Sequence, residues 1–299
     1  MSVTQFRTQD GSASAPVPVT FQTLQAKKQT GQPIAALTAY DYATARLVDE
    51  AGIDLILVGD SLAQVVLGYD NTLPVTVEEM LHHTRAVRRA VRSAIVVADM
   101  PWGSYHLGVE EGLKNAVRFV KEAGAQAVKI EGGANRAELV ERLTAAEIPV
   151  VGHLGLTPQS VHRMGGYKVQ GKTVAAINEL LHDAHALESA GIVLLVLEGV
   201  PREVAARITG EVGIPTIGIG AGPDCDGQIL VIHDLVNLSF SQPAKFVRQY
   251  GNAAALFRKA IDGYRHDVEN RSFPADSESY HLPREVAAAL DRGALREKA

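Results

Sequence analysis

The chain has 299 residues, of which 46% are hydrophobic and 21% charged, so it can bury a large core as one α/β barrel or as two smaller domains. A formal net charge of -5 and scattered Lys and Arg residues argue against a nucleic-acid-binding surface. The single cysteine, Cys225, excludes an internal disulfide and a multi-thiolate zinc site, so a bound metal would need oxygen ligands, alone or with imidazole.

The two ends of the chain differ in composition from its middle. Residues 1–19 are rich in Ser, Ala and Pro and lack the continuous apolar core of a signal peptide, and no later run approaches the length of a membrane span. We predict a disordered tail over 1–19, a single barrel domain over 20–264 and a C-terminal extension over 265–299. We also predict a cytoplasmic location, with no membrane partner.

Short apolar runs alternate with amphipathic segments through the middle of the chain, as in repeated βα units. The runs are nearly continuous in Val, Ile and Leu, which is typical of strands buried on both faces. We predict eight strands, at 34–40, 55–60, 94–100, 127–131, 149–154, 193–198, 214–219 and 229–233. The pattern indicates an α/β protein with a TIM (β/α)8 barrel, because Pro223 breaks the only glycine run that resembles a dinucleotide fingerprint.

Short sequence motifs at the expected helix ends support this alternation of strands and helices. Ala-Gly pairs ending at Gly52, Gly124 and Gly191 each precede a predicted strand, which is typical of a helix closed by a left-handed glycine. Thr76 and Glu79 have the spacing of a capping box and predict a helix start.

Two aspartates each follow an unbroken apolar strand, at Asp60 and Asp99. In a barrel both would lie at the C-terminal mouth, and two carboxylates with room for water and a ligand suit Mg²⁺. For either aspartate alone, a helix cap in a βα loop is the better explanation.

Glu131 adds a third acid at a strand end, which makes capping an unsatisfactory common explanation. Lys129 lies two residues earlier, so both side chains can face the barrel interior. The lysine could neutralise the acids or pair with a substrate carboxylate, and the residues alone favour neither role.

Glu198 ends the most apolar run of the chain, and desolvation there would raise a carboxyl pKa toward the range of a general base. Pairing with Arg202 in the next turn is the structural alternative. His153 also ends a strand, where a histidine can simply be a packed core residue.

Two glycine-rich loops, at 163–172 and 218–228, are long enough to move. The first contains Tyr167, Lys168 and Lys172 and suits a lid over an anionic ligand, although a flexible surface loop explains it equally well. Nothing near Cys225 in the second loop argues for a reactive thiol.

Five long segments, in the same order, closely resemble the ketopantoate hydroxymethyltransferase family: TAYDYATARLVDEAGIDLILVGDSLAQVVLGYDNTLPVT, VKIEGG, VPVVGHLGLTPQSVHRMGGYKVQG, LLVLEGVP and IPTIGIGAGPDCDGQILV. The resemblance runs from about Phe21 to about Tyr264. It implies a barrel of the phosphoenolpyruvate/pyruvate superfamily type, a homodecamer, and transfer of a hydroxymethyl group from 5,10-methylenetetrahydrofolate to 3-methyl-2-oxobutanoate through a Mg-stabilised enolate in pantothenate biosynthesis.

The same resemblance implies roles for single residues. Metal ligands would be Asp60, Asp99 and Glu131, the last directly or through water. The general base would be Glu198. Substrate contacts would come from Asp60, Ser61, Asp99 and Lys129, with His153 near the substrate in an unassigned role. Gly199 departs from relatives that have Cys there.

Two other classes of function compete with this interpretation. A lyase or mutase of the same superfamily would use the same metal scaffold with different loops. A non-catalytic barrel would be favoured if one of Asp60, Asp99, Lys129 or Glu198 were missing, and all four are present.

Overall fold

The computed structural model describes residues 17–291, so most of the predicted tail, residues 1–16, and residues 292–299 lie outside the described part. Eight parallel strands close into a barrel in chain order, with β1 hydrogen-bonded to both β2 and β8. The strands are β1 (Ile34–Thr38), β2 (Leu55–Val58), β3 (Ile95–Asp99), β4 (Ala127–Glu131), β5 (Val150–Gly155), β6 (Leu194–Glu198), β7 (Thr216–Ile219) and β8 (Gly227–Leu230). The predicted (β/α)8 barrel is confirmed.

The last strand is the one predicted least well. It ends at Leu230, whereas the apolar run predicted a strand over 229–233. Ile232 instead begins helix α10 (Ile232–Leu235), and its backbone N–H donates to Thr38 Oγ1 across the closing seam of the barrel. Helix α10 therefore takes up residues that were predicted as the end of this strand.

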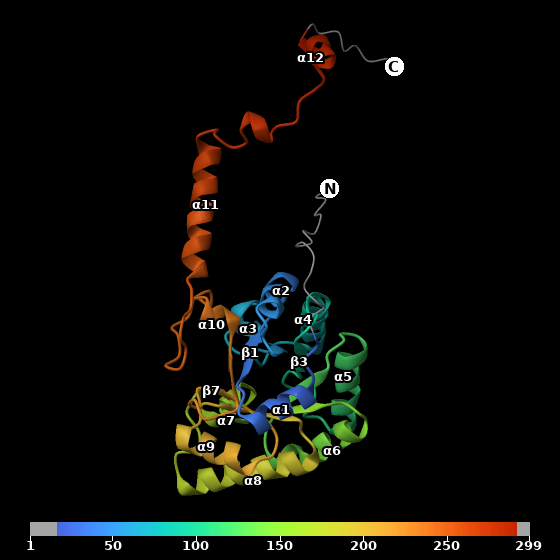
Figure 1. Ribbon diagram of the computed structural model, residues 1–299, viewed down its shortest axis with the longest axis vertical. Helices are drawn as coiled ribbons and strands as arrows, with labels where there is room; N and C mark the ends of the chain where they lie inside the picture. The colour runs from blue at the N-terminus through green and yellow to red at the C-terminus, as the bar shows by residue number, and fades with distance from the viewer. Residues whose placement is uncertain (1–16, 292–299) are drawn as a thin grey trace. The chain divides into compact units, whose positions relative to one another are not determined.

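Helices lie outside the ring of strands (Figure 1). They are α1 (Phe21–Thr30), α2 (Tyr42–Glu50), α3 (Leu62–Val65), α4 (Val77–Ala90), α5 (Val109–Lys121), α6 (Ala137–Ala145), α7 (Val161–Met164), α8 (Val174–Ala190) and α9 (Arg202–Glu211), with 3₁₀ turns η1 (Ala134–Arg136) and η2 (Pro158–Ser160). The capping box of Thr76 and Glu79 opens α4 as predicted. Gly52, Gly124 and Gly191 have φ of 79°, 74° and 104°, which confirms the left-handed junctions.

The barrel interior is apolar below the polar residues of its C-terminal mouth. Inward-facing Val, Ile, Leu and Ala side chains from the strands form one cluster, and Leu24 of α1 packs into it with 0% exposure. Lys27 and Lys28 of the same helix pair with Asp54 and Asp226 at 2.6 and 2.9 Å. Helix α1 thus closes the N-terminal end, which leaves the C-terminal mouth for a site.

Residues 251–291 belong to a second compact unit, and the barrel unit ends at Tyr250. The second unit contains α11 (Ala253–Glu269), η3 (Asp276–Glu278) and α12 (Arg284–Asp291). The domain boundary predicted after residue 264 falls inside α11 and stays a prediction. Among the described residues, no helix combines the length and the hydropathy needed to cross a bilayer.

Candidate active site

The strand-end residues singled out in the sequence gather at the C-terminal mouth of the barrel. Asp99 stands directly beside Lys129 in the register of β3 and β4, and Glu131 stands beside His153 in the register of β4 and β5. Because side chains two residues apart on a strand share a face, these groups continue the inward-facing apolar series that begins deeper in the barrel. The fold therefore places a polar layer on top of an apolar one.

Lys129 pairs with an acid of the chain itself. Its Nζ lies 2.9 Å from Asp99 Oδ1, and both side chains are almost fully buried. Burial alone would lower the pKa of Lys129, but the charges of Asp99, Glu131 and Asp60 outweigh it and raise that pKa. The lysine is thus held as an ammonium group inside the site.

Asp60 follows β2 and lies against Asp99. Its backbone N–H donates to Asp99 Oδ2 at 2.9 Å. Burial and the charges of Asp99 and Glu131 raise the pKa of Asp60 well above its usual range, and burial raises that of Asp99 as well. Asp99 Oδ1 has no aligned hydrogen-bond partner among the described residues, although Lys129 Nζ is close to it.

Glu131 is better satisfied than the two aspartates. Its Oε1 lies 3.3 Å from His153 Nδ1, and its Oε2 accepts from the backbone N–H of Gln159 at 3.0 Å. Burial alone would raise the pKa of Glu131, but the hydrogen bond from His153 and the charges of His153 and Lys129 lower it. Glu131 is therefore a fixed anion with both oxygens engaged.

His153 lies between two glutamates. Its Nδ1 faces Glu131, and its Nε2 lies 3.2 Å from Glu198 Oε2. Burial and Lys129, whose Nζ is 3.2 Å from Nδ1, lower the pKa of His153, but the two glutamates raise it overall to about 9. The raised pKa favours the imidazolium form near neutral pH, with each ring nitrogen within ion-pair distance of one glutamate and with no aligned hydrogen-bond partner for Nε2 among the described residues.

Glu198 ends β6 and is the least buried acid of the group, with 17% of its side chain exposed. Its partner is His153, since Arg202 pairs with Asp224 instead. The neighbouring strand end must approach closely: Gly155 has φ of 93°, and a Cβ there would lie 2.2 Å from the Glu198 carbonyl oxygen. Gly155 therefore lets the chain pass beside Glu198.

Ser61 is also at the mouth, next to Asp60. Its Oγ lies 2.8 Å from the hydroxyl of Tyr40, a fully buried residue whose pKa is raised by burial. Tyr40 therefore fixes the position of the Ser61 hydroxyl.

One predicted lid residue is affected by the acids. Burial and the charges of Asp60, Glu198 and Glu131 raise the pKa of Tyr167, a half-exposed residue. Cys225, in the other glycine-rich loop, is partly buried, and burial raises the pKa of its thiol. Of the two loops, residues 163–172 are the ones that the structure relates to the acids.

The sequence reasoning missed Gln159 and Tyr105. Gln159 Nε2 donates to Asp60 Oδ2 at 2.9 Å, and Tyr105 donates its hydroxyl to Gln159 Oε1 at 2.6 Å. Neither residue ends a strand, and the sequence does not indicate whether an uncharged side chain in a loop is buried. The one available hint was Pro158, which opens the short turn that directs Gln159 inward.

The charge balance of the group fits a divalent cation. With all four carboxylates ionised, one ammonium group and one imidazolium group would leave two negative charges in a buried space, and the raised pKa of Asp60 reflects this missing counter-charge. The carboxylates of Asp60 and Asp99, which the bond from the Asp60 N–H to Asp99 Oδ2 holds side by side, give such an ion hard oxygen donors. Within residues 17–291, however, no three His, Cys, Asp or Glu side chains form a ready metal-ligand cluster, so Asp60 and Asp99 are the pair that fits best.

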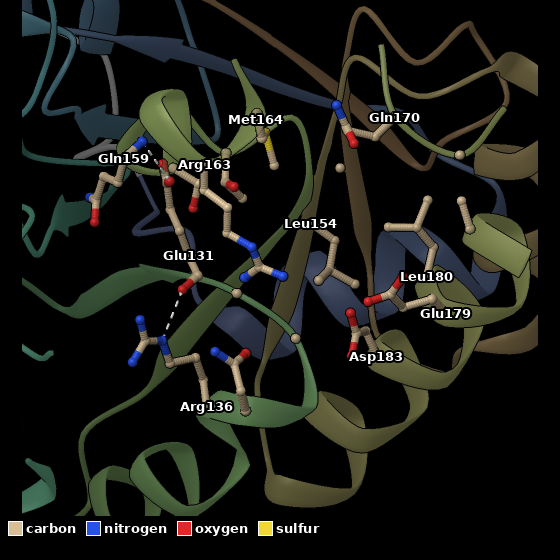
Figure 2. A pocket seen from close by; sticks show the side chains of 18 of the residues that line it. Glu131, Arg136, Leu154, Gln159, Arg163, Met164, Gln170, Glu179, Leu180 and Asp183 are labelled. Atoms are coloured by element: carbon tan, nitrogen blue, oxygen red, sulfur yellow. Dashed lines mark hydrogen bonds between the residues drawn. The ribbon is translucent and has the colours of Figure 1, made fainter. Parts of the chain in front are cut away.

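A cavity of about 510 Å³ adjoins this group and shares Glu131 and Gln159 with it. Figure 2 shows the Arg163 side chain within it, and the Glu179 and Asp183 side chains on another wall. Arg163 has no ion-pair partner among the described residues. The cavity therefore offers a guanidinium group without a direct ion-pair partner to a ligand.

Solved structures with similar folds share little sequence with the chain. A phosphonopyruvate hydrolase complex with oxalate and Mg++ matches with a TM-score of 0.53 and 17% identity, covering 92% of this chain and 96% of that one. A 2,3-dimethylmalate lyase, a member of the PEP mutase/isocitrate lyase superfamily, matches with a TM-score of 0.55 and 16% identity, covering 92% and 98%. These likenesses support the barrel type.

Closer relatives share the sequence itself. The 3-methyl-2-oxobutanoate hydroxymethyltransferase of Koribacter versatilis is 68% identical over 273 residues, covering 91% of this chain and 92% of the relative. The enzyme of the same name from Geobacter sulfurreducens is 52% identical over 257 residues, covering 86% and 96%. A family model described as ketopantoate hydroxymethyltransferase matches residues 18–276. The chain therefore belongs to the ketopantoate hydroxymethyltransferase family.

Proposed function

We propose that this enzyme transfers a hydroxymethyl group from 5,10-methylenetetrahydrofolate to 3-methyl-2-oxobutanoate, which gives 2-dehydropantoate and tetrahydrofolate in pantothenate biosynthesis. Family membership carries the reaction. The observation that carries the site is the pairing of Glu198 with His153 beside the Lys129–Asp99 ion pair, which puts a base and a cation at one mouth.

We infer that Asp60 and Asp99 hold Mg²⁺, and that Glu131 completes the site through water, because both of its oxygens already have partners. Bound there, the ion would supply Lewis acidity to the oxygens of the keto acid and make its C3 proton more acidic. The solved structure with oxalate and Mg++ shares the fold alone with this chain, so the assignment depends on the donor set described above.

Glu198 is the base in this scheme. Its carboxylate is partly exposed to the mouth, while His153 holds one of its oxygens. Lys129 places a permanent positive charge beside the oxygen on which negative charge develops. His153 thus serves to orient Glu198 and Glu131, and Ser61, held by Tyr40, is a donor for the substrate.

The C3–H proton passes to Glu198, and the electron pair left on C3 forms a bond to the one-carbon unit. Both bonds from that carbon, to N5 and to N10 of the folate, break, and water supplies the hydroxyl group. Tetrahydrofolate leaves with both nitrogens protonated, one proton coming from C3 by way of Glu198 and the other from the water.

The co-substrate needs a compartment beside the keto acid, and we assign to it the cavity that adjoins Glu131 and Gln159. The unpaired Arg163 matches a glutamate carboxylate, and Asp183 can accept from the N–H edge of a pterin. Tyr167 and the rest of residues 163–172 would close over both substrates.

A cytoplasmic location, a homodecamer and a barrel domain ending near residue 264 are further proposals, which the family resemblance supports. Sedimentation equilibrium tests the assembly. A truncated chain ending at residue 264 that unfolds cooperatively would support the boundary.

Hydrogen exchange tests the reaction. With Mg²⁺ and no folate, the enzyme should exchange the C3 hydrogen of 3-methyl-2-oxobutanoate with solvent deuterium, followed by proton NMR. Adding 5,10-methylenetetrahydrofolate should convert exchange into product formation. A protein that forms no product with both substrates and Mg²⁺ would contradict the proposed function.

A further inference from the structure

Gln159 is a buried, uncharged residue whose side chain lies among the acids of the site. It has 5% exposure and sits in the 3₁₀ turn that follows β5. Its Nε2 donates to Asp60 Oδ2 at 2.9 Å and to the Met100 carbonyl oxygen at 3.0 Å, and its Oε1 accepts from the Tyr105 hydroxyl at 2.6 Å. Every polar atom of the amide therefore has a partner.

The chemistry of these partners fixes which way the amide points. The Met100 carbonyl oxygen can only accept, so the atom facing it must be the amide nitrogen. Tyr105 donates to the other end of the amide, and its oxygen accepts from the backbone N–H of Glu131 at 3.0 Å. A flipped amide would lose the bonds to both Met100 and Asp60.

The same residue holds a second acid through its backbone. The N–H of Gln159 donates to Glu131 Oε2 at 3.0 Å, as the dashed line in Figure 2 shows. Gln159 thus connects the carboxylate after β2 with the carboxylate that ends β4. One residue sets the position of two acids that stand on different strands.

This arrangement leaves one oxygen of Asp60 available. Oδ2 is taken by Gln159, whereas Oδ1 has no hydrogen-bond partner among the described residues. A neutral amide donor favours the ionised carboxylate without adding charge, while a carboxylate in its place would add a fifth anion to the group. The amide is therefore suited to presenting Asp60 to a cation.

We propose that Gln159 is a positioning residue for the divalent cation site: it orients Asp60 and Glu131, and Tyr105 locks its amide in the required direction. The inference depends on the metal site assigned above. Residues that orient metal ligands typically change metal affinity by about 10- to 100-fold when replaced.

The test is direct binding of Mn²⁺ to the full chain, measured from the free-ion signal in electron paramagnetic resonance. Gln159→Met keeps the length of the side chain and removes its hydrogen bonds, and we expect Mn²⁺ to bind about tenfold more weakly. Gln159→Glu should bind more weakly still. Gln126→Met is the matched control, because Gln126 accepts from the Val96 backbone at the opposite end of the barrel and should keep the wild-type affinity.

A merely structural role predicts a different result. If Gln159 only stabilised the fold, Gln159→Met would unfold at a lower temperature but bind Mn²⁺ normally while folded, and that outcome would overturn the inference. With a positioning role, C3 exchange in Gln159→Met should recover to within about threefold of wild type at saturating Mn²⁺. Exchange that stays low despite full occupancy would also count against it.

Tyr105→Phe covers the case in which Gln159→Met does not fold. It keeps the ring and removes only the hydroxyl that fixes the amide, so we expect Mn²⁺ affinity to fall by about threefold or more. Unchanged affinity in folded Tyr105→Phe would overturn the proposed lock. Failure of the wild-type protein to bind Mn²⁺ would instead refute the metal site itself, so the two failures are distinguishable.

Discussion

His153 Nε2 lies 3.2 Å from Glu198 Oε2, and the opposite nitrogen of the same ring lies 3.3 Å from Glu131 Oε1. One imidazolium therefore connects the acid we assign as base with an acid of the proposed metal site. The contact also limits how far Glu198 can turn, which matters because a base must meet the C–H bond that it breaks.

Replacing Glu198 should abolish enolisation while leaving the fold intact. Glu198→Gln keeps the shape of the side chain but cannot take a proton, so we expect C3 deuterium exchange to fall by about 10²- to 10⁴-fold. Glu203→Gln, an acid in the first turn of α9, is the matched control and should exchange normally. Wild-type exchange in folded Glu198→Gln would remove Glu198 from the mechanism.

Protonation of His153 should stabilise the folded enzyme. The pKa of His153 is raised from 6.5 to about 9 in the folded state by Glu131 and Glu198, against the opposing effects of burial and Lys129. A raised pKa gives a contribution that is complete below the unfolded value and is lost as pH rises through the folded value. The stability of the wild type relative to His153→Gln should therefore decline between about pH 6.5 and pH 9.

Urea unfolding of both proteins at pH 6, 7.5 and 9.5 measures this difference. The comparison cancels groups that titrate alike in the two proteins. A difference in unfolding free energy that is constant, or that grows with pH, would mean that folding does not raise the pKa of His153.

Leu24 should contribute to stability because it closes the N-terminal end of the barrel. Its side chain has 0% exposure and packs against the inward-facing strand residues. Leu24→Ala should lower the free energy of unfolding by about 2–5 kcal/mol. Leu47→Ala, at a leucine with 67% exposure, should change it by less than about 0.5 kcal/mol. Equal effects in the two variants would argue against a stabilising role for α1 at the N-terminal end of the barrel.

The fold was largely predictable because strands buried on both faces leave a continuous apolar pattern, and seven strands lie close to their predicted bounds. The eighth was misplaced because the hydrogen bond from Ile232 to Thr38 connects residues far apart in the chain. A contact of this kind cannot be predicted from the residues of the strand itself.

The site was predictable in part for a related reason. Asp99, Lys129 and Glu198 are charged residues within or at the end of apolar runs, so they can be recognised from the sequence. Gln159 and Tyr105 act through contacts that only the folded chain creates, and their residue types are common in surface loops. The pairing of His153 with two glutamates could not be predicted from the sequence either, because it depends on the register of β4, β5 and β6.

Removing either aspartate should weaken metal binding more than it weakens the fold. Asp60→Asn and Asp99→Asn each remove a negative charge next to the proposed ion, so we expect Mn²⁺ affinity and metal-dependent C3 exchange to fall by at least about tenfold. Asp70→Asn, at an exposed loop position, is the control and should behave as wild type. If both variants keep their Mn²⁺ affinity, the ion binds elsewhere.

Arg163 should matter for the folate and not for the keto acid. It projects into the cavity without an ion-pair partner among residues 17–291. Arg163→Met should therefore raise KM for 5,10-methylenetetrahydrofolate by about tenfold or more, since a charge-assisted hydrogen bond is worth about 1.5–3 kcal/mol. Folate-independent C3 exchange should stay at the wild-type rate.

Arg89→Met, at an exposed position on α4, is the matched control for the loss of one guanidinium group. A tetrahydropterin without the glutamate tail should bind wild type and Arg163→Met equally, because it lacks the carboxylates that Arg163 would meet. If Arg163→Met slows C3 exchange and leaves KM for the folate unchanged, the residue acts on the keto-acid site, and the cavity has another occupant.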